Sequence, residues 1–210
     1  DYLKQVRDVC DEKGVLLILD EVRTGFGRLG RLFAADLYGI EPDIICFGKA
    51  LGGGVMPVGA FMARAEIWDA MFGENPWLHS STFGGSPLAA AAGLAAVRTT
   101  IEEKLPERAA ALEPRLLGGL RRIQERYPAI ITEVRGKGLL AGVQFADADV
   151  AKLVITAMGH EGVLVAYSLN NPCVVRLEPP LIVTEAEIDR ALSVMEECIE
   201  GAASALDGLM

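Results

Sequence analysis

The sequence has few residues that could bind a metal ion or form disulfides. Its 210 residues include four cysteines, none of them in a CxxC pair, and two histidines. This scatter indicates neither a zinc site nor a disulfide framework. We therefore expect no bound metal and four reduced, mostly buried thiols in a cytoplasmic protein.

Positive charge and long apolar runs are also scarce. Lysine and arginine total 20 against 29 aspartates and glutamates, for a net charge of -9. Such a charge opposes binding to a phosphate backbone, so we expect no nucleic-acid partner. The longest apolar stretch, residues 88–97, falls well short of the roughly 18 residues that a membrane span needs, so we expect no membrane insertion.

The remaining pattern is an alternation of helices and strands, which is typical of the α/β class. Helical spacing is already present at Asp1 without a capping residue before it, so we expect that an N-terminal portion of the protein precedes this chain. In the first part of the chain the pattern predicts a helix at 1–12, strands at 15–19, 44–47 and 58–62, and helices at 87–101 and 107–126. Ser86 and Pro87 form a typical helix start.

A change of composition near residue 128 indicates a second, smaller α/β domain. Short apolar runs predict strands at 139–145, 163–166 and 174–177, with a helix near 150–158. Thr184 and Glu187 have the spacing of a capping box before a final amphipathic helix. We therefore divide the chain into residues 1–100, a connecting helix at 101–127, and a domain at 128–210.

Two residues at predicted strand ends carry the main functional signal. Lys49 follows one apolar strand and precedes the glycines at 52–54, and Asp20 ends the other apolar strand. If both strands are buried and parallel, the amine and the carboxylate lie at the same edge of a sheet. A cluster of hydroxyl residues and glycines at residues 80–85 is a third candidate part of the same site. An amine that forms an imine and an acid that pairs with a pyridine nitrogen are the groups that pyridoxal phosphate requires.

Each of these residues also has a simpler interpretation. Lys49 alone is typical of a solvated lysine at a loop entrance, and Asp20 with Glu21 is compatible with a turn or a surface ion pair. The sequence at 25–30 matches the dinucleotide pattern GxGxxG, but two acidic residues directly before it oppose a pyrophosphate. Lys49 also lacks the following Ser or Thr of a phosphate-binding P-loop.

Longer segments resemble the class III, ornithine-type aminotransferases of fold type I, over nearly the whole chain. The segments are LDEVRTGFGRLG at 19–30, PDI at 42–44, GKALGGG at 48–54, PVG at 57–59 and residues 79–87. Within that family, similarity to the enzymes that use putrescine is carried by NPWLH at 75–79, RGKG at 135–138, LNN at 169–171 and RLEPPL at 176–181.

The resemblance implies a fold and a reaction. The chain would contain the remainder of a large mixed-sheet domain and a small C-terminal α/β domain of a fold type I pyridoxal phosphate-dependent transferase. The reaction would be a ping-pong transfer from a primary amine, such as a putrescine-like diamine, to a 2-oxo acid such as 2-oxoglutarate. Ornithine, acetylornithine and 4-aminobutyrate remain open as donors, and so does a catalytically inactive fragment that only folds or dimerises.

The resemblance also assigns roles to single residues. It implies that Lys49 binds the cofactor covalently and moves the proton, and that Asp20 pairs with the pyridine nitrogen. Val22 would pack on the ring. Ser81 and Thr82 would bind the phosphate, with Thr82 reaching the cofactor of the neighbouring subunit of a homodimer.

Three further positions qualify the resemblance. Arg176 corresponds to a position that meets a substrate carboxylate in relatives that use amino acids, although an ion pair with Glu178 is an equally good interpretation. Arg23 stands where glutamine is usual, near the ring's phenolic oxygen, and Ser86 replaces the usual asparagine. In the relatives, an N-terminal half of the chain precedes these segments and supplies much of the substrate pocket. The sequence does not contain that half.

Overall fold

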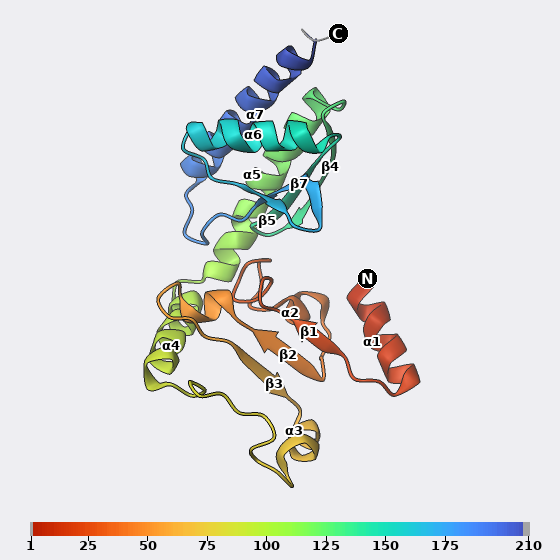
Figure 1. Ribbon diagram of the computed structural model, residues 1–210, viewed down its shortest axis with the longest axis vertical. Helices are drawn as coiled ribbons and strands as arrows, with labels where there is room; N and C mark the ends of the chain where they lie inside the picture. Colours follow the sequence, from red (N-terminus) through yellow and green to blue (C-terminus); the bar gives the residue numbers. More distant parts are fainter. Residues whose placement is uncertain (1, 208–210) are drawn as a thin grey trace. The chain divides into compact units, whose positions relative to one another are not determined.

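The computed structural model describes residues 2–207, with side chains up to residue 204, and its contacts divide the chain into two compact units (Figure 1). Unit 1 extends to residue 107 and unit 2 begins at residue 108. Unit 1 contains α1 (Tyr2–Lys13), β1 (Ile18–Asp20), α2 (Ala34–Tyr38), β2 (Ile44–Phe47), the 3-10 helix η1 (Lys49–Gly52), β3 (Ala60–Ala63), α3 (Ala65–Phe72) and α4 (Pro87–Glu102). The helix α5 (Leu105–Arg126) begins at the end of unit 1 and continues through unit 2, followed by β4 (Ile131–Lys137), β5 (Leu140–Phe145), α6 (Ala148–His160), β6 (Ala166–Ser168), β7 (Asn171–Leu177) and α7 (Glu185–Asp207).

Unit 1 is built on a mixed sheet of three strands in the order β1-β2-β3. β1 and β2 are parallel, with Ile18 opposite Ile44, and β3 runs antiparallel to β2. The 3–4 spacing of apolar residues in α1 places one stripe of the helix against the sheet. This stripe joins a small core of Leu17, Ala35 and Ile40, together with Leu3, Val6, Cys10, Leu19 and Phe33.

The first strand is shorter and more exposed than its sequence predicts. Ordered pairing begins at Ile18, while Val15 and Leu16 are 52% and 56% exposed. The physical reason is that β1 is an edge strand of this sheet, so only part of its apolar surface has a neighbour. The expectation of a fully buried run at 15–19 was wrong for the described chain.

Unit 2 is an antiparallel sheet of four strands in the order β4-β5-β7-β6, with one large hydrophobic core. Burial alternates strictly along β5, as expected for a strand with one face on a core. The core includes Leu120 from α5, Phe145 from β5, Val154 from α6 and Ile199 from α7, all at most 1% exposed. Burying each such side chain contributes about 1.5–3 kcal/mol before conformational entropy is counted.

Several elements differ from the sequence prediction. β4 was missed because its residues are mostly polar, and the run at 163–166 is mainly loop, with β6 starting only at Ala166. The final helix has the predicted capping box, since Thr184 N donates to Glu187 Oε2 at 2.7 Å and Glu187 N donates to Thr184 Oγ1 at 3.2 Å. Ser86 precedes α4 but makes no side-chain capping bond.

The structure bears on two expectations from the sequence, the state of the thiols and the absence of a membrane span. All four cysteines are free, and each is half-buried rather than fully buried. Burial raises the pKa of the Cys198 thiol, and nearby Glu161 and Glu197 add to this. Among the described residues, no helix is both long enough and apolar enough to span a bilayer.

Candidate active site

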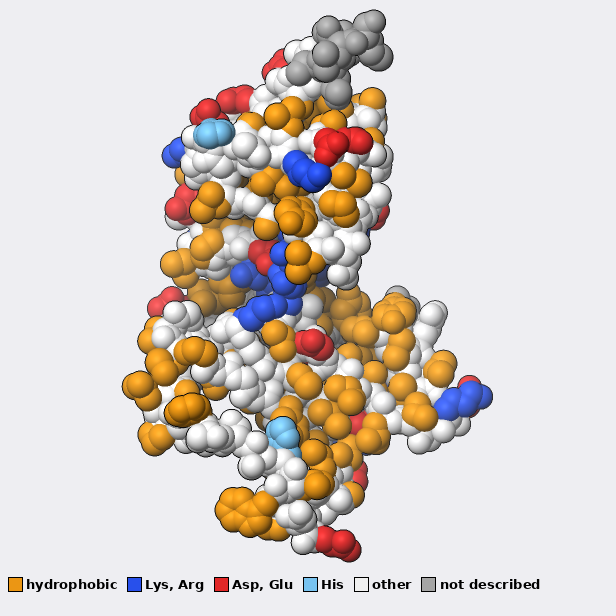
Figure 2. Space-filling view, in the orientation of Figure 1, with side chains coloured by type: hydrophobic (Ala, Val, Ile, Leu, Met, Phe, Trp, Pro, Cys, Tyr) orange, Lys and Arg blue, Asp and Glu red, His pale blue; other side chains and the backbone are white. Residues whose placement is uncertain are grey.

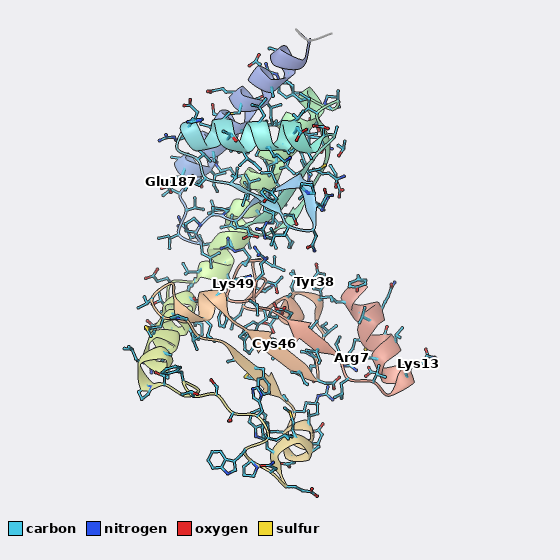
Figure 3. The ribbon with its side chains drawn as sticks, viewed as in Figure 1. Arg7, Lys13, Tyr38, Cys46, Lys49 and Glu187 are labelled. Atoms are coloured by element: carbon cyan, nitrogen blue, oxygen red, sulfur yellow. The ribbon has the colours of Figure 1, made fainter. Side chains whose placement is uncertain are left out.

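The parallel pairing of β1 and β2 brings two chemically different strand ends to one edge of the unit 1 sheet. Asp20, the last residue of β1, lies opposite Cys46 of β2, and Glu21 N donates to Cys46 O at 2.9 Å. Lys49 follows the end of β2 after a single glycine, Gly48. Figure 3 shows Lys49 beyond the carboxyl end of β2 and Arg7 near the opposite end of the sheet. Ligands of open α/β sheets bind at carboxyl strand ends of this kind.

Lys49 has an unusual backbone conformation. Its φ is 43°, in the left-handed region, and it is the first residue of η1. A side chain in this region costs of order 1–3 kcal/mol, and such strain gathers at functional sites. Lys49 borders a depression of about 520 Å³ that is otherwise lined by Met56, Pro57, Val58 and Gly59. The amine is exposed, so the described residues do not supply the desolvation that imine chemistry requires.

Gly48 allows β2 to pass close to the turn after β1. A Cβ at Gly48 would lie 3.3 Å from Val22 Cγ1, which is tighter than normal side-chain packing. Val22 is therefore held directly against the segment that carries Lys49. Asp20 is exposed at the same edge, and its Oδ1 accepts a hydrogen bond from Val22 N at 2.9 Å. The structure thus brings together the Asp20, Val22 and Lys49 segments predicted from the sequence.

Glu21 was not singled out as a site residue, yet it is the most buried acid in the described chain, at 1% exposure. Its Oε1 accepts from Ala35 N at 2.8 Å, and its Oε2 accepts from the Thr24 hydroxyl. Of the two simpler interpretations, a turn or a surface ion pair, the surface ion pair is wrong for Glu21, whereas its backbone O does accept from Gly25 N in a turn. The available signal was its position between a strand end and a glycine-rich turn.

The glycine-rich loop after Glu21 is packed against the sheet by aromatic rings. Phe26, Phe33 and Phe47 form a cluster with ring centroids 5.1–5.7 Å apart. Phe26 has φ 57° and is buried, as is Leu29. A loop whose middle residues fill the core does not present its backbone to a pyrophosphate, which disfavours the dinucleotide interpretation.

Asp43 is a second buried acid, at the amino end of β2. No structural role was predicted for it from the sequence. It is 6% exposed and accepts hydrogen bonds from Leu17 N at 2.7 Å and Arg7 Nη1 at 2.8 Å. It also forms an ion pair with Arg64, whose Nη1 is 3.2 Å from Asp43 Oδ1. The Leu17 amide, followed by the Arg7 guanidinium, holds the pKa of Asp43 below its ordinary value of 3.8. Glu21 and Asp43 thus anchor opposite ends of the same strand pair.

The other predicted residues occupy separate parts of the chain. Ser81 and Thr82 are exposed in the segment between α3 and α4, where Gly84 N donates to Ser81 O at 3.0 Å in a turn. Arg23 is half-buried in the turn after β1. Arg176 lies on β7 in unit 2, and its Nη1 is 3.8 Å from Glu178 Oε1. Its Nε is buried and has no hydrogen-bond partner among the described residues.

The model of the family described as aminotransferase class-III matches residues 1–199. The chain belongs to the class III aminotransferase family. A putrescine aminotransferase from Pectobacterium atrosepticum is 46% identical over 200 residues, which are 95% of this chain and 42% of that protein. The chain therefore spans less than half the length of this relative.

Solved structures of aminotransferases share the fold. An ornithine aminotransferase from Toxoplasma gondii, described with partial occupancy of pyridoxal phosphate at its active site, is 37% identical with a TM-score of 0.89. The match covers 97% of this chain and 47% of that chain. An acetylornithine aminotransferase from Elizabethkingia anophelis is 37% identical with a TM-score of 0.86, covering 95% and 49% of the two chains. The fold of this class III aminotransferase chain is that of pyridoxal phosphate-dependent aminotransferases.

The donor groups at the strand ends fit pyridoxal phosphate. Exposed Lys49 and exposed Asp20 lie at the carboxyl ends of neighbouring parallel strands, with the apolar side chain of Val22 against Gly48. These are an imine-forming group, a partner for a protonated ring nitrogen and an apolar surface for the ring. No group of three or more metal-ligating side chains occurs within the part of the chain that the structure describes.

Proposed function

We propose that the protein containing this chain is a pyridoxal phosphate-dependent aminotransferase. It transfers an amino group from a primary amine, a putrescine-like diamine, to a 2-oxo acid such as 2-oxoglutarate, and it works in the cytoplasm. The observation that carries the proposal is the strained Lys49 at the end of β2, beside the parallel strand that ends in Asp20. The putrescine aminotransferase relative at 46% identity supports the choice of donor.

In this proposal the bound cofactor supplies an electron-withdrawing ring that stabilises negative charge on the substrate carbon. The Lys49 amine would hold the cofactor through its aldehyde carbon, with loss of water, and would serve as the general acid and base for the proton of the substrate carbon. The Asp20 carboxylate holds a proton on the ring nitrogen, because an opposite charge favours the protonated form. Val22 would pack on the ring, and Arg23 would donate to its phenolic oxygen.

A homodimer is part of the proposal. Ser81 and Thr82 would donate to the cofactor phosphate, with Thr82 acting in the neighbouring subunit. Their segment carries Trp77 and Phe83, which are 80% and 84% exposed. Hydrophobic side chains also cover much of the visible surface of the unit 1 elements in Figure 2. A second copy would bury such groups, because contiguous exposed apolar side chains mark interaction surfaces.

Dimerisation and the shared site can be tested together by mixing two variants of the complete protein. Lys49→Ala removes the amine and Thr82→Ala the phosphate donor, so a hybrid dimer would contain one site with both groups intact. We expect activity to rise above that of either variant alone after subunit exchange. A monomer in sedimentation, or no recovery despite proven exchange, would contradict a shared site.

Arg176 would bind the carboxylate of the 2-oxo acid. Its contact with Glu178 is long, at 3.8 Å between Nη1 and Oε1, so the guanidinium retains donors for a carboxylate. The change Arg176→Lys would then raise KM for 2-oxoglutarate more than KM for the amine. Equal changes in both would favour a purely structural ion pair.

The central test is covalent trapping of the cofactor. After addition of pyridoxal phosphate and borohydride to the complete protein, mass spectrometry should find the cofactor on Lys49. Lys49→Ala should abolish both the adduct and transamination, and an unchanged adduct elsewhere would refute the proposal. Lys13, an exposed lysine at the end of α1, provides a matched control when changed to alanine.

Two alternatives are tested by further assays. A panel of putrescine, ornithine, acetylornithine and 4-aminobutyrate with 2-oxoglutarate identifies the donor. An inactive chain that only folds or dimerises is favoured if residues 1–210 alone bind no cofactor. The exposed apolar residues of unit 1 favour this outcome for the isolated chain, because they have no covering partner among the described residues.

A further inference from the structure

Glu21 lies between Asp20 and Val22, two residues of the proposed cofactor site, and both its backbone and its side chain are hydrogen-bonded. Its backbone N donates to Cys46 O at 2.9 Å, and its backbone O accepts from Gly25 N at 3.0 Å. Its carboxylate accepts from Ala35 N and from the Thr24 hydroxyl. The residue therefore ties the end of β1 to β2, to the following turn and to α2 at once.

The turn closed by Glu21 is tight. A Cβ at Gly25 would lie 2.8 Å from Glu21 O, so no larger residue fits there without a shift of the backbone. Asp20 and Val22, on either side of Glu21, are joined by the hydrogen bond from Val22 N to Asp20 Oδ1. Asp20 itself is exposed, so the buried contacts of Glu21 add to the strand pairing with Cys46 that holds the Asp20 backbone.

We infer that Glu21 is a positioning residue for the cofactor site. Its buried carboxylate holds the turn from β1 so that Asp20 faces the ring nitrogen and Val22 faces the ring. The inference rests on the proposed function and adds a residue that does not touch the cofactor. A geometric error of about 1 Å in such a supporting residue is enough to weaken a site.

Asp43 provides a matched control for this inference. Both acids are buried, both accept backbone and side-chain hydrogen bonds, and they anchor opposite ends of the same two strands. Glu21→Ala and Asp43→Ala should both lower the thermal stability of the complete protein. Only Glu21→Ala should weaken cofactor binding beyond what lower stability explains.

The experiment titrates the apo forms of the complete protein with pyridoxal phosphate and follows absorbance and protein fluorescence. We expect Glu21→Ala to raise the dissociation constant at least about tenfold, the lower end of the loss that follows removal of a residue that orients binding groups. Its bound-cofactor spectrum should shift toward that of Asp20→Asn. Glu21→Gln keeps an acceptor for Ala35 N and should stay within about threefold of the unchanged protein.

Each outcome separates the inference from the proposed function. If the unchanged protein binds no pyridoxal phosphate, the proposed function fails. If it binds, and Glu21→Ala matches Asp43→Ala in affinity and spectrum, the positioning role is refuted. If Glu21→Ala does not fold, Thr24→Val removes one donor to the same carboxylate, and an unchanged affinity and spectrum there would equally refute the role.

Discussion

Replacing Asp43 by asparagine should destabilise unit 1 strongly, although the change alters few atoms. The side chain would lose its charge and turn an NH2 group toward a cluster made only of donors. The Leu17 amide would lose a charge-assisted bond of about 1.5–3 kcal/mol, and Arg7 would lose its buried partner. Arg64 is 45% exposed in its side chain, and such exposed pairs contribute at most about 1 kcal/mol. We expect a loss of about 3–5 kcal/mol in the free energy of unfolding, the range found when one partner of a buried pair is removed.

Hydrogen exchange of the complete protein, read on peptides that cover β1 and β2, measures this loss. At about 1.4 kcal/mol for each tenfold change, exchange of the most protected amides should accelerate about a hundredfold or more. Asp11→Asn is the control, because Asp11 pairs with the same Arg7 at 2.7 Å but its side chain is 67% exposed. That variant should change protection by less than about tenfold.

The pH dependence gives an independent check. The pKa of Asp43 lies below 3.8 in the folded protein, so folding is favoured by the charged form. Its stabilisation is fully present above the ordinary carboxyl pKa and is lost as the pH falls below about 4 through the folded value. Asp43→Asn should remove this part of the acid sensitivity. Equal exchange rates in Asp43→Asn and Asp11→Asn, or an unchanged acid profile, would refute the reasoning.

Three further predictions concern unit 2, each measured as unfolding free energy by exchange on its own strands and helices. Thr184→Ala removes the bond from Glu187 N to the Thr184 hydroxyl and leaves the bond from Thr184 N to Glu187 in place, and it should cost about 0.5–2 kcal/mol. A Thr184→Ser variant keeps the hydroxyl, so a similar loss in that variant would contradict the assignment. Phe145→Ala removes a core side chain that is 1% exposed and should lower the free energy of unfolding by about 3–5 kcal/mol. A loss below about 1 kcal/mol would contradict the packing of β5 against the core. Gly119→Ala places a Cβ 2.3 Å from Leu192 Cδ1 and should cost about 1–3 kcal/mol through overpacking of α5 on α7, while a stabilised variant would disprove that contact.

Local sequence rules determined the elements whose signals are strong over a short distance. The 3–4 spacing of apolar residues predicted α1, α5 and α7, and the capping box at Thr184 set the start of α7. The same rules failed for β4, where an edge strand carries mainly polar residues. Ser86 shows a further limit, because it is a residue typical of helix starts and precedes α4, yet its side chain makes no capping hydrogen bond there.

Part of the candidate site could likewise be predicted from the sequence, and part could not. Chemistry and position in the sequence were enough to select Lys49 and Asp20 as candidates, because an amine and an acid at apolar strand ends are groups that pyridoxal phosphate requires. Tertiary structure alone decided that β1 and β2 are parallel neighbours, that Lys49 adopts a left-handed backbone, and that Glu21 is buried while Asp20 is exposed. Pairing, strain and burial depend on residues distant in the sequence, so no local pattern around these positions specifies them.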